Sequence, residues 1–178
     1  MNKDRNPLAL WTSLKQLVAK DANFKEKLEI VLVGQVDFSI LKTIEKNGLT
    51  PFLTKIDFMP HSEVVKEIRK MQCLLLPIND TPNVAGVLPG KLYEYLGAKR
   101  PVICLGPESS DSAKIIEETK AGIRVGYEEW ERLTDYLKNA FKSFQETGEV
   151  RVNNEGILKY SRKNLAKAYS ELLDTLTA

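Results

Sequence analysis

Short apolar runs typical of strands alternate along this chain with longer segments whose apolar residues recur every three or four positions, as in amphipathic helices. The predicted strands cover residues 28–33, 51–57, 73–77, 102–105 and 123–125. The predicted helices begin at Pro7, Asp37, Pro60, Pro89 and Asp111, and two long helices, 128–144 and 157–176, end the chain. Strands that alternate with helices indicate right-handed crossover connections and a parallel sheet.

This order of elements predicts an α/β fold, a Rossmann-like doubly wound parallel sheet of five or six strands with helices on both faces. The run 73–77 is almost wholly apolar, which is typical of a central strand covered on both faces. A doubly wound unit usually begins with a strand, whereas this chain begins with a helix. We therefore expect one domain, 1–178, whose first strand is absent from this chain.

Composition narrows the choice of partners and compartment. The chain has 178 residues with 26 basic and 24 acidic side chains, a net charge of +2 that favours neither nucleic acid nor a charged membrane surface. Cys73 and Cys104 lie inside apolar runs, as buried reduced cysteines do, and with a single histidine they make no metal centre. No signal peptide or membrane-length apolar run is present, so we expect a soluble, cytoplasmic domain.

The stretch 86–98 carries the most specific chemistry, because it places a glycine-bearing loop directly before the helix that starts at Pro89. The unpaired N–H groups and the dipole at a helix N-terminus together favour phosphate groups. The loop 78–88 also leaves the carboxyl end of a strand, where open parallel sheets bind their ligands. We therefore expect a site for a phosphorylated molecule at this position.

Helical spacing places Lys91, Glu94 and Tyr95 on one face of this helix, open to a ligand, and Tyr93 on the face that packs. A carboxylate such as that of Glu94 accepts hydrogen bonds from two vicinal ribose hydroxyls, and Lys91 supplies a positive charge for phosphate. The alternative is that Lys91 and Glu94 form only a weak surface ion pair one helical turn apart.

Two further positions have a ligand-binding and a structural interpretation. The loop 106–112 leads into the helix from Asp111, so its small and hydroxyl-bearing residues either line a second wall of the site or cap the helix, as Ser110 or Asp111 would. His61, the only histidine, lies near a helix start, where its cationic form is disfavoured; we interpret it as a helix-entrance or loop-packing residue, with a catalytic base as the alternative. The sequence contains neither a P-loop nor a dinucleotide-binding glycine fingerprint.

From Asp57 onward the chain resembles the C-terminal domain of retaining, nucleotide-sugar-dependent glycosyltransferases of family four, which have the two-domain GT-B fold. The resemblance rests on the run Pro89-Gly90-Lys91-Leu92-Tyr93-Glu94-Tyr95-Leu96 before Pro101-Val102, on Phe58-Met59-Pro60-His61 and on Ala121-Gly122. Arg5-Asn6-Pro7 is similar to the segment that follows the first strand of that domain. The resemblance covers nearly the whole chain.

The resemblance implies that this domain binds a nucleotide-sugar donor and needs no cofactor or metal. Glu94 matches the second glutamate of the family's pair, which binds ribose, whereas Gly86 stands where the first acid faces the transferred sugar, so the catalytic residue is unknown. Gly90 and Lys91 would lie near the diphosphate, and the loop with Phe58 and His61 near the base. The residues expected to contact the donor are Pro89, Gly90, Lys91, Glu94, Tyr95, Phe58, His61 and Ser110.

In GT-B enzymes the acceptor is bound by an N-terminal domain, so the resemblance implies that this chain is one half of an enzyme and is inactive alone. The acceptor, a glycan, lipid or protein, and any peripheral contact with a membrane would belong to the missing half; no nucleic-acid partner is expected. One alternative is a non-catalytic nucleotide-binding or protein-interaction module of the same fold. A response-regulator receiver would need clustered carboxylates at strand ends, and Asp57 alone does not supply them.

Overall fold

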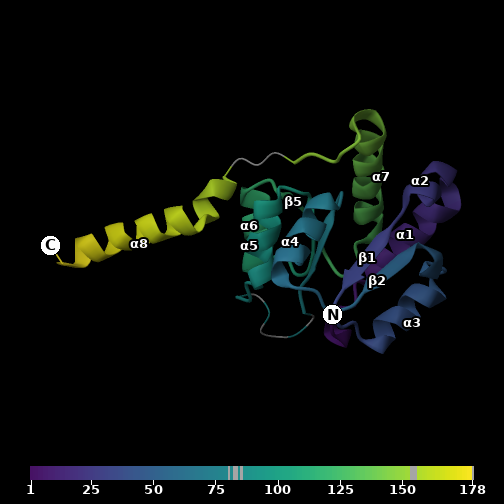
Figure 1. Ribbon diagram of the computed structural model, residues 1–178, viewed down its shortest axis with the longest axis horizontal. Helices are drawn as coiled ribbons and strands as arrows, with labels where there is room; N and C mark the ends of the chain where they lie inside the picture. Colours follow the sequence, from purple (N-terminus) through teal and green to yellow (C-terminus); the bar gives the residue numbers. More distant parts are fainter. Residues whose placement is uncertain (80, 82–83, 85, 153–155, 178) are drawn as a thin grey trace.

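Parallel strands alternate with helices throughout the computed structural model, which describes residues 1–79, 81, 84, 86–152 and 156–177 (Figure 1). The strands are β1 (Ile30–Val33), β2 (Leu53–Ile56), β3 (Leu74–Pro77), β4 (Val102–Leu105) and β5 (Gly122–Val125). The α-helices are α1 (Leu8–Lys20), α2 (Ala22–Lys27), α3 (Phe38–Lys46), α4 (His61–Lys70), α5 (Gly90–Ala98), α6 (Asp111–Glu118), α7 (Trp130–Thr147) and α8 (Arg162–Thr177). The 3₁₀ turns are η1 (Lys3–Arg5), η2 (Thr50–Phe52) and η3 (Ile157–Tyr160).

The strands form two parallel sheets rather than the single sheet of five or six strands that the sequence predicted. β1 pairs with β2, and β3, β4 and β5 form a second sheet in that order. The α/β class and the parallel pairing are confirmed. The expected single sheet is wrong, because no described strand pairs with the other edge of β1 or of β3. For the same reason β3, predicted to be central, lies at the edge of its sheet.

Strand β4 shows that helices cover both faces of the three-stranded sheet, as predicted. Its four residues are all buried, and alternate side chains point to opposite faces. Ile103 and Leu105 belong to one apolar cluster with residues of α1 and α7, whereas Val102 and Cys104 belong to another with residues of α5 and α6. The two faces of the sheet therefore have separate cores.

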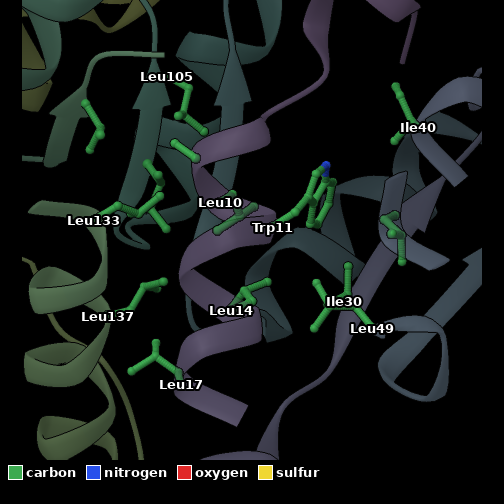
Figure 2. Packing of buried hydrophobic residues seen from close by; sticks show 14 of the residues in the cluster. Leu10, Trp11, Leu14, Leu17, Ile30, Ile40, Leu49, Leu105, Leu133 and Leu137 are labelled. Carbon is green, nitrogen blue, oxygen red and sulfur yellow. The ribbon is translucent and has the colours of Figure 1, made fainter. Parts of the chain in front are cut away.

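Helix α1 joins the two sheets through the first of these cores (Figure 2). Trp11 and Leu14 point toward Ile30 of β1, and Leu10 and Leu17 lie toward α7 and β4. The Trp11 ring is fully buried, and its Nε1 donates to Asn6 Oδ1 at 2.8 Å. The two sheets thus share one core although they exchange no backbone hydrogen bonds in the described residues.

The C-terminal helix departs from the sequence prediction of one element over 157–176. Ser161 has extended backbone angles, with φ −68° and ψ 144°, and separates η3 from α8. Helix α8 extends away from the rest of the domain (Figure 1) and leaves an apolar stripe in solvent. The stripe consists of Leu165, Tyr169, Leu172, Leu173 and Leu176. Within the part of the chain described, no helix is both long and apolar enough to cross a membrane.

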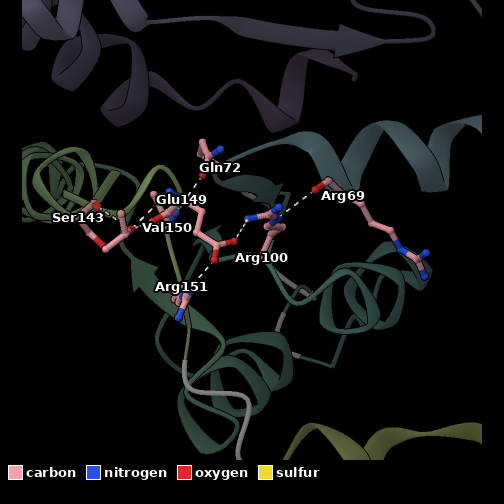
Figure 3. A network of polar contacts seen from close by, with 8 residues as sticks. Arg69, Gln72, Arg100, Ser143, Glu149, Val150 and Arg151 are labelled. Carbon is pink, nitrogen blue, oxygen red and sulfur yellow. Dashed lines mark hydrogen bonds and ion pairs between the residues drawn. The ribbon is translucent and has the colours of Figure 1, made fainter. Parts of the chain in front are cut away.

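A polar network closes the amino-terminal end of the three-stranded sheet (Figure 3). Arg100, just before β4, donates from Nε to the carbonyl oxygen of Arg69 at 3.0 Å and lies 3.4 Å from Glu149. Glu149 also accepts from Arg151 at 2.7 Å, and these residues border a cavity of about 420 Å³. The network ties α4 and the segment after α7 to the start of β4, at the opposite end from the predicted ligand site.

Candidate functional site

Three helices begin where strands end, and their first turns gather at the carboxyl-terminal edge of the sheets. β2 leads into α4 at His61, β3 leads toward α5 at Gly90, and β4 leads into α6 at Asp111. Ligands of open parallel sheets bind at this edge. Residues 80, 82–83 and 85 of the predicted loop 78–88 lie outside the described residues, so the site is built from its remaining parts.

His61 and Glu94, both expected to contact the donor, lie side by side. His61 Nε2 is 3.2 Å from Glu94 Oε1, which joins the first residue of α4 to the middle of α5. The imidazole is 71% exposed and the carboxylate 36% exposed, so both groups remain accessible from solvent. The second carboxylate oxygen of Glu94 and its remaining lone pairs leave the group able to accept further hydrogen bonds.

The N-terminus of α5 carries no side-chain cap. Pro89, the cap residue, has extended angles and no polar side-chain atom, and its carbonyl oxygen accepts from Leu92 N at 2.9 Å. A Cβ atom added to Gly90 would meet no atom within 4 Å, so this end of the helix has open space beside it. The first-turn amide groups of Gly90 and Lys91 are therefore placed to receive an anionic group.

Lys91 and Arg5 bring positive charge to the same edge. Burial, followed by the charges of Lys91 and Arg5, lowers the pKa of the Met1 amino group, while Asp37 acts in the opposite direction. The Nε of Arg5 donates to Oδ1 of Asn79, two residues beyond β3. Arg5 was absent from the predicted donor contacts, although its place after an expected first strand was the signal that could have identified it.

Asn79 in turn is anchored to the other side of the sheet. Its carbonyl oxygen accepts from the hydroxyl of Tyr127, which follows β5, at 2.7 Å. The ends of β3 and β5 are therefore linked across the end of β4, and Arg5 is held against this link. Neither Asn79 nor Tyr127 was predicted, because their proximity depends on the pairing of strands far apart in the sequence.

The loop 106–112 packs against the loop that leads into α5. Ser112 Oγ donates to the carbonyl oxygen of Val87 at 3.1 Å, and the Ser112 side chain is fully buried. Ser110 is also fully buried, and its Oγ accepts from Ala113 N at 3.2 Å. Ser110 therefore caps helix α6, the structural role that the sequence offered as the alternative to lining the site. The two serines set the shape of this wall from inside the protein.

The two tyrosines of α5 exchange the faces that helical spacing suggested. Tyr95 packs against the cluster between α5 and α6, and burial, together with the charge of Glu94, raises the pKa of its hydroxyl. Tyr93 is exposed, and its ring centroid lies 6.4 Å from that of Tyr160 in η3. The η3 turn thus contacts α5 on the side of Tyr93, whereas Tyr95 leaves the expected ligand face and packs against the cluster between α5 and α6.

Phe58 and Gly86 border the site without packing into it. The Phe58 side chain is 91% exposed, an unusual position for a large apolar ring. A Cβ atom added to Gly86 would meet nothing within 4 Å, so this position has room for a larger side chain. The fold therefore leaves room beside Gly86 for the first carbon of the acid that the family resemblance places there.

A buried arginine supports the outer part of the loop 106–112. The Arg124 side chain in β5 is 8% exposed, and its guanidinium lies 3.6 Å from Glu108 and 3.4 Å from Glu129. A hydrogen bond from Gly126 N, followed by the charges of Arg124 and Arg132, lowers the pKa of Glu129. Among the described residues, no group of three or more histidine, cysteine or carboxylate side chains is placed to hold a metal ion.

Comparisons with known proteins bear on the fold. No protein-family profile and no curated protein sequence matches this chain. Among solved structures, the chain is similar to alpha,alpha-trehalose 6-phosphate synthase from Burkholderia multivorans, with a TM-score of 0.58 and 12% sequence identity. The match covers 95% of this chain and 37% of that one. The chain therefore shares its fold with a part of this synthase.

Proposed function

We propose that this chain is the nucleotide-sugar-binding domain of a retaining glycosyltransferase. The observation that carries the proposal is the Glu94 carboxylate beside His61, next to the uncapped start of α5 and on the edge that also holds Lys91 and Arg5. A diol and a diphosphate are the two groups that such a carboxylate and such a cationic helix end recognise. The fold shared with a part of a trehalose 6-phosphate synthase supports a glycosyltransferase-like domain.

Each group has a role in this proposal. Glu94 accepts hydrogen bonds from the two ribose hydroxyls, and His61 orients that carboxylate. The amides of Gly90 and Lys91 and the Lys91 ammonium group hold the diphosphate, with Arg5 as an additional cation. The exposed ring of Phe58 lies against the base, and the wall fixed by Ser112 limits the space for the sugar.

Transfer of the sugar needs an acceptor, and the proposal assigns the acceptor to a preceding domain. Displacement of the nucleoside diphosphate by an acceptor hydroxyl requires both substrates in one geometry. The chain alone would then bind the donor without turning it over. The acceptor would be a glycan, a lipid or a protein.

Calorimetric titration of the purified chain with UDP-, GDP- and ADP-sugars tests the proposal. We expect one of the three donors to bind, and Glu94→Gln to weaken that binding by about tenfold or more, because charged hydrogen bonds to the diol are lost. Glu146→Gln, an exposed carboxamide substitution on α7, is the matched control and should leave the affinity unchanged. Absence of binding by all three donors, or equal affinity of the Glu94→Gln variant, contradicts the assignment.

Gly86 supports a second candidate, a nucleotide-binding module of the same fold without transferase activity. The position that carries an acid in the resembling family has no side chain here, although the space for one exists. The two candidates differ in a protein that also contains an acceptor domain: a catalytic domain transfers sugar there, whereas a non-catalytic module binds the nucleotide and remains inactive. Gly86→Glu in that protein should raise transfer only if the remaining machinery is present.

A further inference from the structure

The apolar stripe on α8 has the spacing of a coiled coil. Four of its residues follow one another at intervals of four, three and four positions: Leu165, Tyr169, Leu172 and Leu176. These are alternating a and d positions of a heptad repeat, the positions through which two helices pack against each other. The four side chains are between 46% and 75% exposed. The stripe therefore has the pattern of a helix that packs on another helix, yet it lies in solvent.

Helix α8 also has little support from the domain that carries it. Its main packing contacts are with η3, and it extends away from the sheets (Figure 1). The 16 residues of α8 span about 24 Å. An isolated helix of this length is only marginally stable in water, because most helical stability in proteins comes from packing of the apolar face. A cover on the stripe would therefore stabilise α8 itself.

The area of the stripe fits a weak dimer. Its exposed side chains present about 500 Å² of apolar surface, which is near the upper end of the largest patch on a typical monomer. Two such stripes packed together would bury about 1,000 Å², the lower end of specific protein interfaces. Leu158 in η3, 73% exposed, adds apolar surface at the base of the helix. An interface of this size corresponds to a dissociation constant in the micromolar range.

The charges of α8 are separated along the helix. Its first half carries Arg162, Lys163 and Lys167, and its second half carries Glu171 and Asp174. An antiparallel pair of α8 helices places the basic half of each beside the acidic half of the other, and it also opposes the two helix dipoles. A parallel pair brings like charges together. The acidic half also disfavours an anionic membrane, where amphipathic helices carry mainly basic residues. Charge therefore favours a second, antiparallel copy of α8.

The geometry of the chain permits the antiparallel pair. Because α8 extends away from the domain, the two domains would attach at opposite ends of the pair and would not compete for the same space (Figure 1). The register that places Tyr169 of one copy against Leu172 of the other also places Leu165 against Leu176. Ala166 and Ala168 flank the stripe on its two sides, and their small side chains allow close approach of the helices.

We propose that α8 forms an antiparallel two-helix coiled coil with α8 of a second copy of this chain, which makes the chain a homodimer. Leu165 of each copy packs against Leu176 of the other, and Tyr169 and Leu172 pack around the twofold axis. The apolar contacts supply the affinity, and the separated charges set the direction of the pair. This proposal does not depend on the proposed donor binding.

Sedimentation velocity of the full chain from about 1 to about 200 µM tests the dimer. We expect the monomer to convert to a dimer with a dissociation constant in the micromolar range. Leu172→Glu places a charge in the middle of the stripe and should weaken the dimer by about tenfold or more. Ser170→Glu places the same charge on the opposite, polar face of α8 and is the matched control, with an affinity within about twofold of the original. Both positions are exposed, so both variants should keep the domain folded.

Disulfide crosslinking tests the direction of the helices. Leu165→Cys and Leu176→Cys chains are oxidised separately and as a mixture, and the original chain, with Cys73 and Cys104, is the blank. In the antiparallel pair these two positions face each other, so the mixture should form a disulfide-linked dimer. Neither variant should do so alone, because equivalent positions lie about 16 Å apart along the helix axis, beyond the reach of a disulfide.

Three results would overturn the proposal. The first is a chain that stays monomeric at about 200 µM, or a Leu172→Glu variant that dimerises as well as Ser170→Glu does. The second is crosslinking of Leu165→Cys with itself at the yield of the mixture, which would mean a parallel pair. The third is a monomer that binds vesicles of phosphatidylcholine and phosphatidylglycerol and loses this binding on Leu172→Glu, since a membrane surface would then cover the stripe.

Discussion

His61 Nε2 and Glu94 Oε1 lie 3.2 Å apart, although 33 positions separate the two residues in the sequence. The contact crosses from the first turn of α4 to the middle of α5 and marks the point where the loops after β2 and β3 meet. A histidine and a glutamate that were expected separately to contact one ligand are thus brought together by the fold. The contact gives the candidate site a fixed reference point.

Removal of this contact should change stability little. Both groups are partly or largely exposed, and exposed ion pairs contribute about 0–1 kcal/mol. We expect His61→Ala, Glu94→Gln and the double variant to unfold in urea within about 1 kcal/mol of the original chain, with a coupling energy below that value. A loss several times larger would show that the pair has a structural role, and the affinity test for Glu94 would then need a different variant.

Substitution of alanine at two glycines should change the stability of the domain in opposite directions. A Cβ atom at Gly122 would lie 2.0 Å from the carbonyl oxygen of Val102, a backbone atom that cannot move aside without disturbing the β4–β5 pairing. At Gly97, in α5, it would meet nothing within 4 Å. Gly122→Ala should destabilise the domain by about 3 kcal/mol or more, and Gly97→Ala should stabilise it by about 0.5–1 kcal/mol through helix propensity. Thermal unfolding of both variants measures the difference; equal midpoints would contradict the close approach of β4 and β5.

The buried thiols should make the fold sensitive to alkali. Burial raises the pKa of both Cys73 and Cys104 to about 12 from an ordinary value of 9.0. Above pH 9 the thiols of the unfolded chain lose their protons while those of the folded chain keep them, so the unfolded state gains stability as the pH rises. We expect each thiol to lower the free energy of unfolding by as much as about 1 kcal/mol between pH 8 and pH 10.

Urea unfolding at the two pH values measures this cost. Tyrosine hydroxyls also titrate above pH 9, so the informative quantity is the difference between the original chain and the Cys73→Ala, Cys104→Ala double variant. The double variant should lose less stability on going to pH 10. An equal loss in the two proteins would mean that the thiols ionise alike in the folded and unfolded states.

Removal of α8 should leave the rest of the domain folded. The residues of its apolar stripe are exposed, and its main packing contacts are with η3. A chain that ends at Ser161 keeps the bonds of Lys159 and Tyr160 to Glu118, which hold η3 on α6. We expect its unfolding midpoint to lie within about 2 °C of that of the full chain and its tendency to self-associate to fall. A large drop in the midpoint would show that α8 packs on the domain in solution.

Most elements were predictable because each has a local signal. The strands lie within the predicted runs or one residue from them, since apolar and β-branched residues mark them directly. Asp37 caps α3 as predicted, with Oδ1 accepting from Ser39 N at 2.8 Å. The short helix α2 was missed although Asp21 caps it, because six residues are too few to show a periodic pattern. The break at Ser161 was missed because no proline or glycine marks it.

The candidate site was only partly predictable. Pro89, Gly90, Lys91 and Glu94 lie at the start of one helix, so their grouping follows from sequence spacing alone. The proximity of Arg5 to Asn79, and of Tyr127 to the same residue, depends on strand ends that meet only after pairing. The exposure of Tyr93 and the burial of Tyr95 depend on which face of α5 packs against α6 and η3, elements that come later in the chain.

The sequence by itself determined the α/β class, the parallel character of the strands and the helix start that carries Lys91 and Glu94, because these depend on hydrophobic period and on residues close together in the chain. Only the tertiary structure decided that the strands form two sheets, that β3 lies at an edge, and that His61 meets Glu94. Pairing joins residues separated by long loops, and a strand's own composition does not specify which edge finds a partner. The apolar β1 and β3 have the composition of interior strands, and each keeps one edge that no described strand pairs with.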